Sequence, residues 1–237
     1  MTSLRFRCPP GFEDILPAPR PAAEALPDWL KNMPAKSTSD LFNGEDVRTL
    51  KQCPPFIDAM TQGVIIPLVC DVEIRDGEIS WDWAPPPLGD QLFSRAPIGL
   101  HLPEQGAGSD LGLDPDRFVV KFMNFWTIEA PPGWSVLFTH PCNRLELPFT
   151  TLTGTVDCDR FCGGLVHFPA VLNPEFEGVI EKGTPVAQAI AIPRSALEMD
   201  IGVMTPREAE TLVEVQGALQ SDPGVYRKRF RASRTNS

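Results

Sequence analysis

The sequence predicts a mainly β protein with a proline-rich N-terminal arm and one C-terminal helix. The chain of 237 residues contains 26 prolines and 18 glycines, and proline is excluded from helix interiors and from central strands. The short apolar runs between these residues are rich in β-branched side chains, as in strands joined by turns. One stretch near the C-terminus combines a helix-start signal with helical spacing of its apolar residues.

The composition is that of a folded protein, and it limits the partners. Hydrophobic residues make up 42% of the chain, enough to fill a core. The formal net charge is -10, and a negative surface repels phosphate backbones, so the body of the protein is not expected to bind nucleic acid. No apolar run approaches the roughly 20 residues of a membrane span, and the start has no apolar stretch typical of a secretory signal. We therefore expect a cytoplasmic protein without membrane contact.

Residues 1–50 are predicted to form an arm that wraps the main body. Prolines make the stretch from Ile15 to Pro27 extended or polyproline-like. A short amphipathic piece follows, in which Trp29 and Leu30 are candidate apolar anchors. The alternative is an arm that contacts another subunit.

A β domain is predicted over residues 51–203. Its clearest element is a hairpin between the runs 64–74 and 79–83, because Asp76-Gly77 is typical of a tight hairpin turn. Residues 84–116 are rich in proline and glycine and are predicted to form a long ordered loop. Further strands are expected at the remaining apolar runs: Phe118–Ile128, Trp134–Thr139, Thr151–Val156, Leu165–Phe168 and Val186–Ile192.

The predicted helix occupies residues 204–221. Thr205 is the expected N-cap, Pro206 suits the first helical position and Glu208 completes a capping box. Residues 222–237 then form a basic tail. This tail either lies across the acidic body or binds phosphate groups or nucleic acid.

The cysteines have two interpretations. Free thiols are expected for all six in a reducing cytosol. The alternative is a metal site, because zinc favours tetrahedral sets of sulfur and nitrogen, and five such side chains fall close together: His140, Cys142, Cys158, Cys162 and His167. Iron would require two histidines and a carboxylate, for which Asp157 is available. Buried thiols and hydrogen-bonded histidines compete with both metals and are favoured over them.

Asp157 and Asp159 are the candidate catalytic residues. They lie two positions apart at the end of an apolar strand, so their side chains are predicted to share one face. Such a pair can orient a water molecule, hold sugar hydroxyl groups or bind magnesium. The competing interpretation is a polar turn after a strand.

Three segments within residues 131–193 resemble the dUTPase and dCTP deaminase superfamily. Gly154–Gly163 resembles its motif of a glycine, two aliphatic residues and two spaced aspartates. Phe176–Ile190 resembles its later motif, a glycine turn and a strand with Ala-Gln, and Pro132–Leu137 resembles its Pro-x-Gly strand. The resemblance implies a β-clip or jelly-roll-like barrel or sandwich, and a homo-oligomer, possibly trimeric in that family's manner, with small-molecule sites between subunits.

The same resemblance implies roles for individual residues. Asp157 would hold the sugar and its attacking water, and Gln188 would face the α-phosphate, with magnesium as the cofactor of hydrolysis. Arg144 is a loose substitute for the arginine of the family's phosphate motif, and Phe161 stands one position beyond the expected aromatic. The resemblance bears on fold more than on catalysis, because function depends on the site.

The whole chain is also similar to a poorly characterised family of bacterial and viral proteins of unknown function. This similarity rests on residues 51–60, 140–144 and 183–188 and implies no activity. Two functional hypotheses follow: a protein that binds or hydrolyses a phosphorylated nucleoside, and a non-catalytic oligomeric β module with a structural or interaction role. A metal-binding β-barrel protein is a third.

Overall fold

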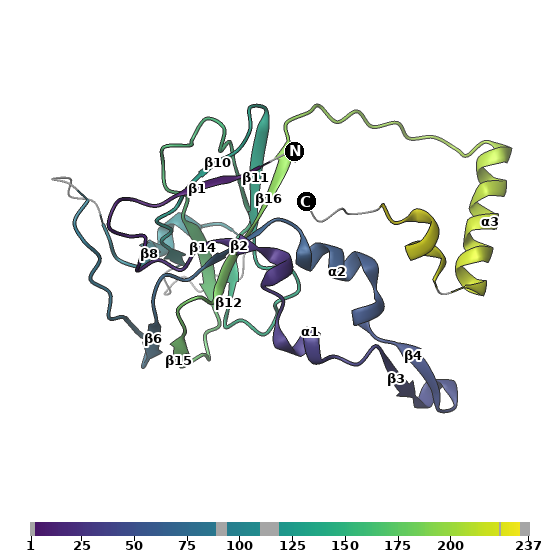
Figure 1. Cartoon of the computed structure of the whole chain (residues 1–237), viewed down its shortest axis with the longest axis horizontal. Coiled ribbons are helices and arrows are strands. Elements are labelled where there is room, and N and C mark those ends of the chain that lie inside the picture. Colours follow the sequence, from purple (N-terminus) through teal and green to yellow (C-terminus); the bar gives the residue numbers. More distant parts are fainter. Residues whose placement is uncertain (1–2, 89–93, 110–118, 223, 233–237) are drawn as a thin grey trace. The chain divides into compact units, whose positions relative to one another are not determined.

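A computed structural model describes residues 3–88, 94–109, 119–222 and 224–232 (Figure 1). The predicted loop 84–116 and the end of the basic tail thus lie partly outside the described residues. The chain divides into two compact units, Met1–Asn32 with Asp58–Arg194, and Met33–Ile57 with Ser195–Ser237. Among the described residues, no helix is both long and apolar enough to cross a membrane.

Antiparallel sheets build the first unit, which confirms the mainly β prediction. The largest has the order β13-β11-β16-β5-β2, with bounds Gly154–Val156, Trp134–Thr139, Pro185–Pro193, Val64–Pro67 and Arg20–Pro21. The second has the order β12-β14-β9-β8, with bounds Phe149–Thr151, Phe168–Leu172, Val119–Phe122 and Ile98–His101. The smaller sheets are β15-β6-β7 (Gly178–Ile180, Val72–Arg75, Glu78–Ser80) and β1-β10 (Arg5–Arg7, Thr127–Glu129). The described strands leave these sheets open rather than closed into a barrel.

The predicted hairpin is present as β6 and β7. Asp76 and Gly77 have φ values of 53° and 77°, as a tight turn with two left-handed residues requires. The apolar run 64–74, however, contains two strands in different sheets instead of one. Leu68, the residue after β5, still bonds to the turn before β16: its amide donates to Thr184 O (2.8 Å), and its carbonyl accepts from Gly183 N (2.9 Å).

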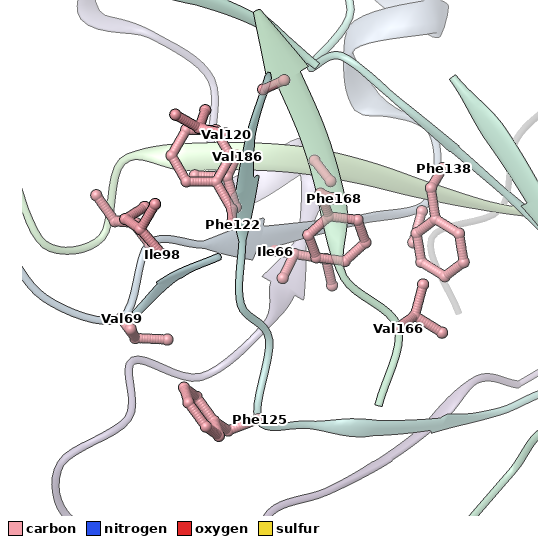
Figure 2. Packing of buried hydrophobic residues seen from close by; sticks show 14 of the residues in the cluster. Ile66, Val69, Ile98, Val120, Phe122, Phe125, Phe138, Val166, Phe168 and Val186 are labelled. Carbon is pink, nitrogen blue, oxygen red and sulfur yellow. The ribbon is translucent and has the colours of Figure 1, made fainter. Parts of the chain in front are cut away.

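The hydrophobic core is formed by side chains from the two larger sheets. Figure 2 shows Ile66 and Val186 of the first sheet with Phe122 of the second. Phe138 of β11 and Phe168 of β14 link the sheets directly, with ring centroids 5.3 Å apart. Aromatic pairs at such distances add to the stabilisation from burial. The two larger sheets thus share one apolar core.

Three of the strand predictions need correction in their bounds. The run 118–128 contains β9 and the first two residues of β10, with an irregular stretch between them, and the run 151–156 contains the end of β12 and all of β13. The run 165–168 meets only the first residue of β14. The strand predicted at 134–139 matches β11, and β16 contains the strand predicted at 186–192.

The described part of the N-terminal third contains two α-helices, α1 (Asp28–Asn32) and α2 (Pro54–Thr61). The proline-rich start of α2 hides it in the sequence, although proline is accepted in the first helical turn. The residues before Met33 belong to the first unit, where Phe12 and Leu16 enter the core and Leu30 is 3% exposed.

The second unit contains the hairpin β3 (Lys36–Ser39) and β4 (Glu45–Arg48) and the helix α3 (Pro206–Ser221). The predicted cap of α3 is confirmed: Glu208 N donates to Thr205 Oγ1 (3.4 Å), and Thr205 N donates to Glu208 Oε2 (2.6 Å). A π-helical turn at Tyr226–Phe230 follows in the basic tail.

Candidate functional site

The predicted carboxylates lie at the start of β11, where the neighbouring strands β13 and β16 end. The antiparallel register of β11 and β13 brings Asp157, the residue after β13, next to Ser135. The register of β11 and β16 brings Arg194, the residue after β16, next to Gly133, and Arg194 N donates to Gly133 O (2.8 Å). Segments far apart in the sequence therefore place two acids and one base around the same strand end.

Arg194 binds both carboxylates. Its Nη1 donates to Asp159 Oδ1 (2.6 Å), and its Nη2 donates to Asp159 Oδ2. Nη1 also lies 3.2 Å from Asp157 Oδ1, and that oxygen accepts a 2.6 Å hydrogen bond from Ser135 Oγ. The second oxygen of Asp159 accepts from the amide of Gly133 (2.9 Å). We call Ser135, Asp157, Asp159 and Arg194 the arginine clamp.

The arginine clamp lowers the pKa of both acids. The hydrogen bond from Ser135, followed by the charge of Arg194, lowers the pKa of Asp157. The hydrogen bonds from Arg194 lower the pKa of Asp159 far below its ordinary value, because they stabilise the carboxylate. A general acid needs a raised pKa and a general base one near the working pH. Both acids are shifted in the opposite direction, so the clamp disfavours acid–base chemistry.

Gln188 lies inside the protein and is 1% exposed. Its Nε2 donates to Ala59 O (2.9 Å) and Gln62 O (2.6 Å), and its Oε1 accepts from Cys142 N (2.8 Å). A side-chain amide has two donors and one carbonyl oxygen. Both donors are used and the oxygen is engaged, so Gln188 joins the end of α2 to the turn at Cys142 and has no donor left for a phosphate.

The structure does not bring Gln188 to the arginine clamp. Gln188 pairs with Thr139 at the far end of β11, four residues from Ser135, a separation of roughly 13 Å along a strand. A cavity of about 450 Å³ lies elsewhere, with the lining residues Trp83, Ala84, Pro85, Arg95 and Ala96. None of the predicted site residues lines this cavity.

The histidines of the metal hypothesis have protein hydrogen-bond partners. His140 Nδ1 accepts from Thr151 N (3.3 Å), and its Nε2 lies 3.0 Å from Arg144 O. A carbonyl only accepts, so the two contacts suit a ring that donates from Nε2 and accepts at Nδ1. His167 Nδ1 accepts from Asn124 N (3.2 Å), and burial, together with the charge of Lys121, lowers the pKa of His167 to about 4.

The cysteines occupy different environments, and all six are free. Cys158 is fully buried in the core, and burial raises the pKa of its thiol to about 11. Burial also raises the pKa of Cys142, whereas Cys162 is exposed. Metals bind the thiolate, which these raised pKa values disfavour. Across the described parts of the chain, no three His, Cys, Asp or Glu side chains gather as a metal-binding group.

Arg144 and Phe161, the other predicted binding residues, each contact another part of the chain. The guanidinium of Arg144 forms an ion pair with Glu146 through its Nε, and its side chain is 14% exposed. Phe161 is 48% exposed, and its ring lies so close over Gly164 that a Cβ there would be 2.1 Å from the ring. Arg144 is therefore already paired, and Phe161 covers a glycine turn.

Sequence reasoning did not identify Arg194 and Ser135 as members of the site. The acidic pair was the signal available in the sequence, because two neighbouring carboxylates are stabilised by a nearby cation and so predict a basic partner. The partner comes from 35 residues away in the sequence, and only the pairing of β11 with β16 selects it from the 21 basic residues of the chain.

Comparisons with known proteins give limited results. No protein-family model and no curated protein matches the chain. Among solved structures, a mutant dUTPase from phage phi11 of S. aureus is similar at 12% identity and a TM-score of 0.28, over 46% of this chain and 98% of that one. A mutant dUTPase of Staphylococcus bacteriophage 80alpha with dUpNHpp has 12% identity and a TM-score of 0.27, over 46% of this chain and 89% of that one.

Proposed function

We propose that this chain is a non-catalytic β module that acts by association with other protein chains. The observation that carries the proposal is the arginine clamp. Arg194 occupies both oxygens of Asp159 and one oxygen of Asp157. The carboxylates that would perform chemistry instead hold the ends of β11, β13 and β16 together.

The environment of Gln188 supports the same proposal. A phosphate-binding amide must present a donor to the ligand, but both donors of Gln188 Nε2 are bonded to backbone carbonyls. Releasing them would leave polar groups unpaired in a largely buried place, at a cost of about 1–3 kcal/mol for each group. Gln188 serves the module as a structural link.

The association is supported by apolar side chains on the surface of the second unit. Leu41 and Phe42, at the tip of the β3–β4 hairpin, are 94% and 60% exposed. Further apolar residues are exposed between β16 and α3. Contiguous exposed apolar surface is typical of interaction sites. A homo-oligomer is the assembly we propose.

Binding of a phosphorylated nucleoside at Asp157 is the second candidate. The side chain of Asp157 is 50% exposed, against 8% for Asp159, so it is the predicted catalytic residue that reaches solvent. Its carboxylate could accept a hydrogen bond from a sugar hydroxyl while Ser135 and Arg194 hold its other oxygen. Magnesium would be the cation to add, since it is bound through carboxylates and phosphates.

A panel of nucleoside triphosphates with magnesium separates the two candidates. The module is expected to show no turnover and no shift in melting temperature with any nucleotide, because its carboxylates are occupied. The matched variant is Asp157→Asn, which keeps the size of the side chain. Nucleotide turnover that Asp157→Asn abolishes, with little change in melting temperature, would overturn the non-catalytic proposal and establish the second candidate.

A further inference from the structure

The segment between β16 and α3 has the residue pattern of a β-strand. Apolar and other residues alternate from Leu197 to Val203, with Glu198 and Asp200 as acidic members. Alternation with a period of two places all apolar side chains on one face and both acids on the other. We call residues 197–203 the alternating arm.

The apolar face of the alternating arm is uncovered. The four side chains that form it are exposed to between 77% and 97%: Leu197 88%, Met199 77%, Ile201 85% and Val203 97%. The arm is not part of any strand in the described chain, and no ion pair of Glu198 or Asp200 occurs within the described residues. The alternating arm thus has the residue pattern of a strand in a sheet but is paired with no sheet in the described chain.

Strand β8 offers a sheet edge of matching character. It is the last strand of its sheet, and β9 is its one neighbour among the described strands. Ile98 and Leu100 lie on the same face of β8; Ile98 is 6% exposed, whereas Leu100 is 51% exposed. The apolar face of this sheet is therefore covered at Ile98 and exposed to solvent at Leu100. A strand added here would bury Leu100 with its own apolar side chains.

The opposite face of this edge carries a positive charge. Lys121 of β9 pairs with Gly99 of β8, and its side chain crosses over that glycine: a Cβ at Gly99 would lie 3.4 Å from Lys121 Cε. The absence of a side chain at Gly99 thus leaves room over β8 for the stem of Lys121, beside Met123 Sδ, which lies 3.1 Å from the same position. The described residues provide no ion pair for Lys121.

The two patterns match when the strands pair in antiparallel register. If Leu197 lies opposite Leu100, Glu198 lies opposite Gly99, and if Met199 lies opposite Leu100, Asp200 lies opposite Gly99, because cross-strand neighbours share a face. That acid would meet the ammonium group of Lys121. The same register therefore covers the apolar face and pairs the charges on the other face.

We infer that the alternating arm adds as an antiparallel strand to the β8 edge of a second copy of this chain. Each copy carries both the arm and the edge, so the contact is self-complementary and can be made reciprocally. Backbone hydrogen bonds along the added strand supply affinity, and the alternating side chains supply specificity. The inference rests on the proposed function, since it specifies how the module associates.

The test measures self-association of the full chain by analytical ultracentrifugation over a range of concentrations. The double variant Met199→Lys/Ile201→Lys is expected to weaken self-association about tenfold or more, because two apolar side chains can no longer be buried. Its matched control is Leu145→Lys/Val213→Lys, which changes two apolar residues that are 91% and 71% exposed elsewhere on the chain. This control is expected to associate like the unmodified chain.

A charge exchange tests the partner edge. Lys121→Glu is expected to weaken self-association, and adding Glu198→Lys/Asp200→Lys to it is expected to restore association. A chain that is monomeric at all concentrations, or an oligomer that the arm variants leave intact, would overturn the inference. A lower melting temperature of the monomer in the arm variants would overturn it too, since the arm then packs on its own chain. An oligomer that the arm variants leave intact would overturn this inference but leave the proposed homo-oligomer standing, whereas nucleotide turnover would overturn the proposed function and leave the arm contact standing.

Discussion

Arg194 and Asp159 form a two-pronged ion pair that joins the end of β16 to the turn after β13. Nη1 lies 2.6 Å from Oδ1, and Nη2 donates to Oδ2. The guanidinium presents two parallel donors to the two carboxylate oxygens, which is the geometry that makes such pairs specific. The ends of three strands are held by this contact, and its removal is the most direct way to measure what the acids do.

Replacing Arg194 with Ala is expected to lower the melting temperature at pH 7, because Asp157 and Asp159 then lie side by side without a cation. Arg194→Lys keeps the charge without the double hydrogen bond and is expected to be intermediate. Thermal unfolding followed by circular dichroism measures both. The control is Arg207→Ala in the exposed α3 helix, expected to have little effect. A melting temperature unchanged by Arg194→Ala would contradict a structural clamp.

The same ion pair predicts that its contribution to the stability of the fold depends on pH. The pKa of Asp159 is lowered from its ordinary value of 3.8 by the hydrogen bonds from Arg194. Its stabilising contribution is therefore complete well above pH 3.8 and is lost as the pH falls below that value. The difference in melting temperature between the unmodified chain and Arg194→Ala is expected to shrink below about pH 4. A difference that stays constant down to pH 2 would assign the stabilisation to packing instead.

The lowered pKa of His167 predicts a second, separate dependence of the stability of the fold on pH. Burial lowers the pKa of His167 from 6.5 to about 4. The unfolded chain takes up a proton near pH 6.5 while the folded chain does not, so stability is expected to fall between about pH 6.5 and pH 4. His167→Gln keeps an acceptor for Asn124 N but does not titrate, and it should flatten this slope in chemical denaturation. His101→Gln, outside the core, serves as control, and an equally flat slope there would disprove the assignment.

Gln188→Met is expected to destabilise the fold by about 2 kcal/mol, because the polar groups that bonded the amide lose their partner. Three backbone atoms are affected: Ala59 O, Gln62 O and Cys142 N. Chemical denaturation measures the change, and Gln220→Met on exposed α3 is the matched control. If Gln188→Met were as stable as the control, the amide would be free for a ligand after all.

The surroundings of Gly63 predict that one added methyl group there strongly lowers the free energy of unfolding. Gly63 and Gly77 have nearly the same φ, 76° and 77°. A Cβ at Gly63 would lie 2.1 Å from Ala189 O, whereas no described residue other than the two neighbours of Gly77 in the chain lies within 4 Å of a Cβ at Gly77. Gly77→Ala should therefore cost about 1 kcal/mol from backbone strain alone, and Gly63→Ala clearly more. Equal free energies of unfolding for the two variants would show that the chain relaxes at Gly63.

Local signals in the sequence predicted local structure well. The Asp-Gly turn, the cap at Thr205 and the full extent of β11 are each determined by a few neighbouring residues. The errors occur where the chain passes from one sheet to another, as between β12 and β13. The strand pattern continues through such a crossing, because alternation of side chains does not specify which sheet a residue joins.

The candidate site was predictable in the same uneven way. The acidic pair is visible in the sequence, and its position after a strand is as expected. Whether such acids are free or paired depends on Arg194, and the role of an Ala-Gln strand depends on which carbonyl groups face the amide. Both depend on strand pairing over long sequence separations, which spacing does not reveal.

Gln188 carries a wider consequence for how this chain is compared with others. One amide fastens a helix end, the turn after that helix and a distant turn, so a substitution must be accommodated in all three at once. A glutamine kept for this reason persists whether or not a nucleotide was ever bound. An Ala-Gln pair shared by two chains can thus reflect a common structural link in their folds rather than a common reaction.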